Sequence, residues 1–345
     1  TDIYGPNRVD VLREDTLSQV SPTVTEIPSR LISVFGRVNY TFLDRYLLTA
    51  TVRRDGSSKF GPAQRWGTFP SAALAWRIHQ EPFMQDVSLI SSLKLRLSAG
   101  ITGNQEIGDF NYAPFYNTGG RRAQAQFGNQ FVPTIRPRAA DQTLQWEETT
   151  TYNVGLDYGI LEDRITGSFA VYRKITDELL FDTTAPRFNN LSDFVLTNVG
   201  KMRNQGIEAT VDASVMNSES ISYSAQFNAS YNQNELLDLA QAGSELPTGG
   251  ISGGIGNTVQ VLKEGEPINS FFTYRHRRDE NGDLFTLEDT RRLEEQYLEE
   301  TGRDTTISRY VDQNGDGVIN AEDRVVTGSP QPNWVLGHTS NFRIQ

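Results

Sequence analysis

The residues with the most chemically informative spacing form an oxygen-rich loop near the end of the chain. The segment 312–323 reads DQNGDGVINAED, with side-chain oxygens at its first, third, fifth and ninth positions and an acid at its twelfth. Glycine at the sixth position permits a sharp turn, and the seventh residue offers its backbone carbonyl, as in loops that wrap one Ca2+ ion. The ligands predicted by this spacing are Asp312, Asn314, Asp316, Val318, Asn320 and Asp323.

Two details of this loop keep a second interpretation open. Asp323 stands where a calcium loop usually carries a bidentate glutamate, and its shorter side chain predicts a weaker or water-assisted site. The preceding residues 308–311 read as extended chain, so a paired helix–loop–helix unit is not expected. The alternative is a turn rich in Gly and Asn, held by bonds from side chains to the backbone. Calcium is the one cofactor that the sequence suggests, and no other is required.

Aromatic and amide side chains in the polar connections are a second candidate site. Stacking on rings combined with amide hydrogen bonds is how proteins hold sugars and peptides. The alternatives are packing within the loops, or an aromatic belt at a membrane interface. The candidate substrate-binding residues are Trp66, Asn104, Gln105, Tyr112 and Tyr116.

Catalytic and phosphate-binding sites are not indicated. Glu147 and Glu148 are adjacent on an expected strand and would face opposite ways, while the acidic pairs after Leu287 lie in a charged run typical of a solvated helix. The segment 55–61, DGSSKFG, lacks the spacing and the following helix of a phosphate-binding loop. The three histidines at 79, 276 and 338 are too scattered for a metal triad. We therefore expect no enzymatic activity.

The elements that must position these residues are amphipathic strands. Apolar and polar residues alternate with a period of two, which places them on opposite faces of a β-strand. In the first strand, for example, Val34, Val38 and Tyr40 alternate with Ser33, Arg37 and Asn39. The nine expected strands lie in the ranges 32–42, 46–53, 70–78, 93–102, 146–160, 165–171, 206–215, 223–231 and 334–344.

The connections between these strands alternate in length. Short turns at 43–45 and 161–164 contrast with long connections at 103–143, 174–205 and 232–333. Short periplasmic turns, long extracellular loops and strands of about 9–11 residues are typical of an outer-membrane barrel, whereas a β-sandwich has no reason to sort its loops by length. A sheet of nine strands left open in lipid would have unpaired backbone groups at its edges, so we expect these strands to be only part of a barrel.

Composition excludes several classes of protein. The chain has 345 residues, 37% of them hydrophobic, and a net charge of −11 without a basic stripe, which argues against nucleic acid as a partner. It has no cysteine, hence no disulfide or thiolate site. No apolar run reaches the roughly 18 residues of a transmembrane helix. No signal peptide opens at Thr1, so we expect a mature or internal piece.

Several long motifs also resemble a known family. They are RVNYTFLDRYLLTATVRRDGSSKFG, RWGTFPSAALAWRI and LKLRLSAGITGNQEIG, followed by LQWEETTTYNVGLDYGILEDRITGSFAVYRKITDELL, NVGKMRNQGIEATVDA and YVDQNGDGVINAEDRVVTGSPQPNW. In this order they resemble the barrel of SusC/RagA-type TonB-dependent outer-membrane transporters of the Bacteroidetes. The resemblance runs from about Arg30 to the last residue.

The resemblance implies an all-β, antiparallel transmembrane β-barrel in the cell outer membrane, present here in part and with long extracellular loops. Residues 1–28 would be a loop from a preceding barrel segment, and 29–345 the barrel portion, including the long loop 232–333 with the motif 312–323. The implied partners are a SusD-like lipoprotein, the TonB system through an upstream plug, outer-membrane lipid, and an oligosaccharide or peptide substrate for import.

A secreted all-β carbohydrate-binding module with a calcium-organised loop is the alternative. In that case the apolar strand faces would pack on each other, and the chain would fold in water without detergent. A glycan-degrading enzyme would need an acid/base pair that the sequence does not offer.

Overall fold

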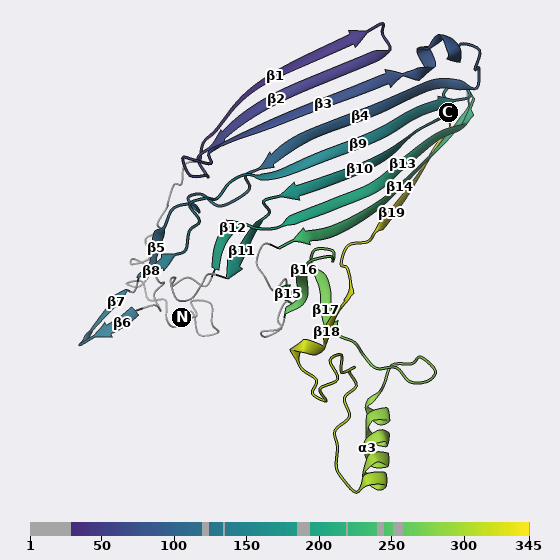
Figure 1. Ribbon diagram of the computed structural model, residues 1–345. Helices are drawn as coiled ribbons and strands as arrows, with labels where there is room; N and C mark the ends of the chain where they lie inside the picture. The colour runs from purple at the N-terminus through teal and green to yellow at the C-terminus, as the bar shows by residue number, and fades with distance from the viewer. Residues whose placement is uncertain are drawn as a thin grey trace, which may run out of the picture.

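A single antiparallel sheet of nine strands dominates the structure (Figure 1). The computed structural model describes residues 29–118, 124–133, 135–184, 194–218, 220–239, 245–250 and 258–344. In spatial order the strands are β1 (Leu31–Phe42), β2 (Tyr46–Ser57), β3 (Trp66–Arg77), β4 (Ile90–Asn104), β9 (Glu147–Ile160), β10 (Ile165–Asp177), β13 (Lys201–Asn217), β14 (Ile221–Asp238) and β19 (Trp334–Ile344). The predicted all-β fold, with nine strands of a larger barrel, is confirmed.

The strand register aligns the apolar residues into one face. A single lateral row crosses all nine strands through Tyr40, Leu48, Leu74, Leu97, Val154, Val171, Ile207, Tyr231 and Trp334. Because side chains alternate, the neighbouring positions point to the other face. A polar row there runs through Arg37, Thr51, Ser71, Gly100, Thr151, Lys174, Asn204 and Asn234. We call these the outer face and the inner face.

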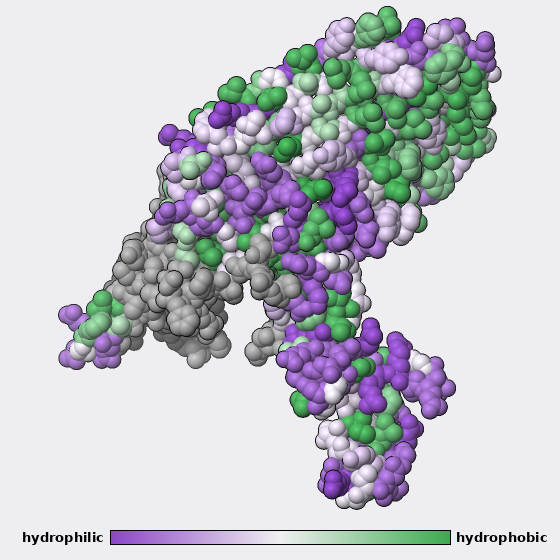
Figure 2. Space-filling model, viewed as in Figure 1, coloured by the Kyte–Doolittle hydropathy of each residue, from purple (hydrophilic) through white to green (hydrophobic). Residues whose placement is uncertain are grey.

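The outer face is uncovered among the described residues. Val38 is 65% exposed and Leu336 is 74% exposed, although both stand in regular strands. Figure 2 shows hydrophobic side chains gathered over the part of the sheet near the short connections, and hydrophilic ones over the end that carries the long connections. The expectation of the binding-module alternative, apolar faces packed on each other, is therefore wrong for this sheet.

Short and long connections lie at opposite ends of the sheet (Figure 1). In the first short turn, Leu43 and Asp44 both have positive φ, as the primed turns of tight β-hairpins require. The β3–β4 connection contains two 3₁₀ turns, η1 (Ile78–Gln80) and η2 (Pro82–Met84). The other short connections span 161–164 and 218–220. This sorting of the connections was predicted from the sequence.

The long connections fold into small elements of their own. They contain the two-stranded sheets β5 (Phe115–Thr118) with β8 (Ile135–Arg138), β6 (Gln124–Phe127) with β7 (Gln130–Pro133), and β11 (Leu180–Thr184) with β12 (Phe194–Asn198). The last holds a four-stranded sheet of β15 (Glu245–Gly250), β16 (Thr258–Lys263), β17 (Ser270–Tyr274) and β18 (Arg324–Gly328), with α3 (Leu287–Thr301) and η3 (Ala321–Asp323). The charged run after Leu287 is the solvated helix that its pattern predicted.

Several strands extend farther than the predicted 9–11 residues. β13 has 17 residues and begins at Lys201, and β14 has 18 and ends at Asp238, so the last long connection starts at Leu239 rather than at 232. Beyond the apolar band, polar side chains continue the pairing: Arg203 forms an ion pair with Glu235, and Asn234 donates to Asn204. Backbone pairing needs no hydrophobic side chain, so the apolar pattern underestimates these strands.

Most of the buried hydrophobic residues gather where the long connections leave the sheet. One cluster consists of Phe60, Phe69, Ile107, Leu144 and Trp146, and the other of Leu179, Leu236, Leu239 and Leu262. In the described part of the chain, no helix is long and apolar enough to cross a membrane. The predicted loop at 1–28 lies outside the described residues.

Candidate functional site

A polar trough on the inner face is the main candidate site. It spans β1–β4, β9 and β10 and has a volume of about 940 Å³. Phe69 of the first buried cluster lines one end of it. Threonine and serine hydroxyls line much of it, because inner-face positions of neighbouring strands are aligned by the register. Its charged lining residues are Arg37, Arg53, Asp55 and Lys174.

The arginines of the trough are held in place by neighbours. Arg53 Nε lies 2.7 Å from Asp55 Oδ1, and its Nη2 donates to Ser33 Oγ at 3.2 Å. Arg37 Nε donates to Thr51 Oγ1 at 3.2 Å. Each guanidinium has five donors, so several stay free to bind a ligand. The described wall offers hydrogen-bond donors and acceptors for a polar molecule, but not the paired acid and base of a hydrolase.

An aromatic knot of Phe60, Phe69 and Trp146 lies at the long-connection end of the trough, which Phe69 also lines. The Trp146 ring centre lies 5.0 Å from that of Phe60 and 5.4 Å from that of Phe69. The Phe69 ring covers Gly67 and Gly103, where an added Cβ would come within 2.4 and 2.1 Å of it. Glycine is required at both positions for this close approach. The knot thereby ties the β2–β3 connection to the β4–β9 connection above the trough.

The predicted substrate residues do not all lie at one place. Trp66 is on the outer face, 48% exposed, with the guanidinium carbon of Arg54 5.4 Å from its ring centre. Tyr112 packs against the aromatic knot. The backbone of Tyr116 belongs to β5, and its side chain lies outside the described residues. Substrate contact by these residues stays a prediction.

The two amides of the set lie beside the knot. Asn104 Nδ2 donates to Glu147 Oε1 at 3.1 Å, and its Oδ1 accepts from the backbone of Glu106. Gln105 Oε1 is buried and accepts no hydrogen bond from the described residues. Sequence reasoning did not single out Arg37, Arg53 or Lys174, because the alternation marks them only as polar and cannot show that they converge.

The segment 312–323 forms a compact loop whose backbone turns around the carboxylate of Asp312. Asp312 accepts hydrogen bonds from the backbone amides of Gly315 and Gly317, both at 2.7 Å, and both glycines have positive φ. Asp323 is fully buried and accepts from the amides of Asn320 and Gln313. These amides lower the pKa of Asp323, which keeps its carboxylate ionised.

The donor set of this loop fits a hard cation only in part. Its predicted ligands are oxygens, and each bonded carboxylate oxygen retains a further lone pair. However, no group of three or more His, Cys, Asp or Glu side chains in the described ranges is arranged to hold a metal. Calcium binding by this loop stays a prediction.

Comparison with known proteins identifies the family. The family model described as "TonB dependent receptor-like, beta-barrel" matches residues 2–253. The chain belongs to this family. The TonB-dependent receptor SusC of Bacteroides thetaiotaomicron is 38% identical over 325 residues, which cover 91% of this chain and 30% of SusC. TonB-dependent receptor P3 of Formosa agariphila is 31% identical over 319 residues, covering 92% of this chain and 31% of P3.

A solved structure shows the same fold. The structure of the RagAB peptide transporter matches 91% of this chain and 31% of its own chain, with a TM-score of 0.72 and 23% identity. The predicted SusC/RagA-type TonB-dependent receptor barrel is confirmed, and the chain is an outer-membrane protein. Its relatives are receptors and not enzymes, in agreement with the sequence prediction. The chain spans about 30% of the length of these relatives.

Proposed function

We propose that the complete protein imports oligosaccharides or peptides across the outer membrane, powered by the TonB system. The observation that carries the proposal is the inner-face trough, a wall of hydroxyls and anchored cations opposite a continuous apolar face. Such a wall suits a ligand with many hydroxyl, amide or carboxylate groups. No bond of the substrate is broken in this mechanism, which consists of binding, gating and release.

We further propose that a SusD-like lipoprotein docks on the long connections. These connections emerge together at one end of the sheet, which would face the cell exterior in a membrane-embedded barrel (Figure 1). The proposed organisation places the barrel portion at 29–345, with residues 1–28 continuing a preceding connection and a plug upstream linking the barrel to TonB. The structure of the RagAB peptide transporter supports peptides as one substrate class.

Uptake by cells tests the transport proposal. Cells that lack the gene would be complemented with the full-length protein and given labelled oligosaccharides and peptides of increasing length. Uptake of one class should return with complementation and disappear when TonB is deleted.

Arg53→Gln should reduce uptake several-fold, because Arg53 lies on the inner face. Arg54→Gln, one position along β2 and on the outer face, should not reduce it. Equal uptake by complemented and uncomplemented cells would overturn the proposal.

We also propose that the loop 312–323 binds Ca2+ and uses it to brace the last long connection. The spacing of its oxygens and the wrapped backbone around Gly315 and Gly317 support this. Tb3+ bound there should show emission sensitised by Tyr310, and Ca2+ should displace it. Asp316→Asn should weaken binding at least tenfold, while Asp304→Asn, in the same connection but outside the motif, should not. Identical titrations for the two variants would exclude the loop.

A further inference from the structure

A boundary between apolar and polar residues crosses the outer face of four neighbouring strands. One lateral row consists of Val154 on β9, Val171 on β10, Ile207 on β13 and Tyr231 on β14. The next row toward the long connections consists of Tyr152, Arg173, Gln205 and Gln233 on the same strands. The outer face thus changes from mostly aliphatic to mostly polar side chains between one outward-facing position on each strand and the next.

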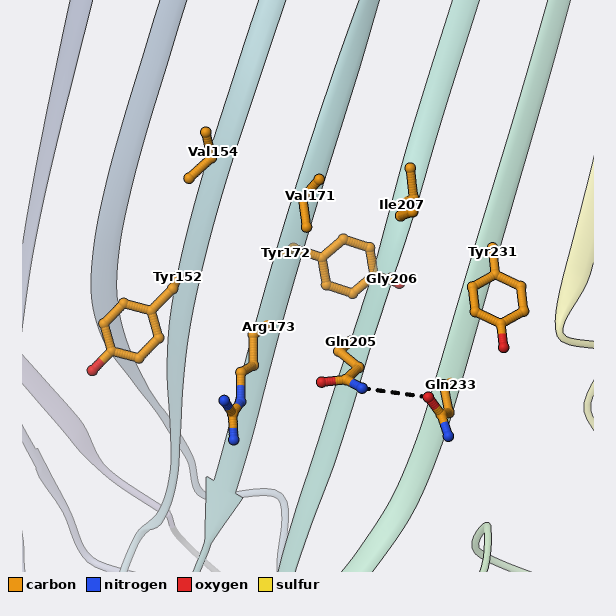
Figure 3. A pocket seen from close by; sticks show the side chains of 10 residues that line it. All are labelled: Tyr152, Val154, Val171, Tyr172, Arg173, Gln205, Gly206, Ile207, Tyr231 and Gln233. Atoms are coloured by element: carbon orange, nitrogen blue, oxygen red, sulfur yellow. Dashed lines mark hydrogen bonds between the residues drawn. The ribbon is translucent and has the colours of Figure 1, made fainter.

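These two rows enclose a shallow cavity of about 450 Å³. Figure 3 shows Val154, Val171 and Ile207 on one side of it and Arg173, Gln205 and Gln233 on the side nearer the long connections. The rings of Tyr152 and Tyr231 stand at its flanks. The cavity therefore has an apolar floor for a hydrocarbon chain and a polar end for a headgroup.

Arg173 is the one cation that lines this cavity, and its guanidinium makes no hydrogen bond or ion pair with the described residues. The outer-face cation of the next row behaves differently, because Arg203 is paired with Glu235. The two amides are linked to each other, Gln205 Nε2 donating to Gln233 Oε1 at 3.3 Å. Arg173 thus presents its donors outward at the edge of the apolar band.

The position along the strand places the backbone of Arg173 near the extracellular edge of the apolar band, which is about 25 Å tall, and its long side chain can reach from there to the lipid headgroups. Arg173 lies eight residues after Ile165, the start of β10, which corresponds to roughly 26 Å along the strand and about 20 Å across the membrane at a tilt of roughly 40°. Arg173 lies toward the end of the sheet that carries the long connections. In such barrels that end is extracellular, so Arg173 lies in the outer leaflet. An unpaired guanidinium at this level is suited to a phosphate, which it can bind with two parallel hydrogen bonds.

We propose that this cavity binds a phosphate-bearing acyl lipid of the outer leaflet, with the phosphate on Arg173 and an acyl chain along Val154, Val171 and Ile207. The free side-chain amide hydrogens of Gln205 and Gln233 add donors to the headgroup. The apolar floor continues down the strands through Leu156, Phe169 and Ala209, in register with one another, which gives the chain a path within the lipid-facing band. This inference uses the membrane location of the barrel and is independent of the transported substrate.

Native mass spectrometry of the full-length receptor in detergent tests the site. The probes are bisphosphorylated lipid A, dephosphorylated lipid A and a zwitterionic phosphatidylethanolamine. The wild-type protein should retain one bisphosphorylated lipid A more tightly than the other two. Arg173→Gln should weaken that adduct at least tenfold, and Arg54→Gln, which removes an outer-face cation outside the cavity, should leave it unchanged.

Three outcomes would overturn the proposal. They are an equal loss of the adduct in both variants, an undiminished adduct in Arg173→Gln, and equal retention of lipid A with and without phosphate. A fourth is a tight adduct of phosphatidylethanolamine alone, because Arg173 would then not select the anionic phosphate headgroup that the proposal assigns to it. Uptake by the Arg173→Gln cells is measured alongside and should match the wild type, so failure of the lipid site and failure of the transport proposal give different results.

Discussion

Single side chains on the two faces of the sheet should tolerate charge very differently. Leu95 points to the outer face, where it is in register with Trp76 and Leu156. Arginine near the midplane of a lipid-facing strand costs about 2–4 kcal/mol. We therefore expect Leu95→Arg to destabilise the full-length barrel by that amount in urea unfolding from lipid vesicles.

The matched change one residue along β4 should cost much less. Arg96 is on the inner face and forms an ion pair with Asp157 at 2.7 Å, in which Lys94 takes part at 2.8 Å. Partly exposed pairs contribute about 0.2–1 kcal/mol, and Lys94 still compensates Asp157 in Arg96→Leu. Unfolding free energies that fall equally for the two variants would contradict the assignment of faces.

At the residue scale, the sequence predicts which way a side chain points but not what it meets. The alternation in 32–42 and 46–53 assigned the faces correctly, since it depends only on strand geometry. Trp66 shows the limit, because its place on the outer face follows from register with Gly56. Convergence of Arg37, Arg53 and Lys174 in one trough likewise depends on pairing between strands, which no single strand reveals.

Among the elements, the β3–β4 connection depends on one carboxylate. Glu81 lies between η1 and η2, is 6% exposed, and accepts hydrogen bonds from Tyr46 Oη at 2.7 Å, Trp76 Nε1 at 2.9 Å and Arg45 Nη1 at 2.9 Å. These residues belong to the ends of β2 and β3 and to the first short turn, so Glu81 fastens the connection to both. The connection should therefore loosen when Glu81 loses its charge.

The pH dependence of this connection follows from the same bonds. Hydrogen bonds from Trp76, then from Tyr46 and Arg45, lower the pKa of Glu81 below its usual range. A lowered pKa gives stability that is present above the unfolded value, about 4.3, and is lost as pH falls through the folded one. We expect amide protection at 78–89, measured relative to the intrinsic exchange rate at each pH, to be high at neutral pH and to fall at acidic pH.

Glu81→Gln and Glu162→Gln give a direct comparison for this element. In Glu81→Gln the amide protection of 78–89 should be low at every pH. An uncharged amide cannot replace a carboxylate that accepts hydrogen bonds from three donors. Glu162, in the exposed short turn between β9 and β10, carries the same charge at the same end of the sheet. Protection at 78–89 that is unchanged in Glu81→Gln would refute the role given to this carboxylate.

Element boundaries were the least predictable part of the fold. The apolar pattern ends where the membrane-facing band ends, yet β13 and β14 continue through polar pairs such as Arg203 and Glu235. The helix α3 was predictable, since its run of charged residues starts at a Thr286–Asp289 capping box and ends at Gly302. The small sheets of the long connections were missed, because strands of four to six residues carry too short an alternation.

For the whole molecule, the topology leaves one side of the sheet's first and last strands unpaired. Among the described residues β1 pairs only with β2, and β19 only with β14. Hydrocarbon offers no water to such edges, and each unsatisfied backbone group there costs several kcal/mol. The 345-residue chain expressed alone should therefore fail to form a closed barrel in lipid or detergent. After refolding it should stay sensitive to trypsin and run at one position in electrophoresis with and without heating.

The full-length receptor, treated in parallel, should resist trypsin and shift on heating, because its remaining strands complete the pairing of β1 and β19. A monomeric, trypsin-resistant form of the 345-residue chain would show that its sheet closes without further strands.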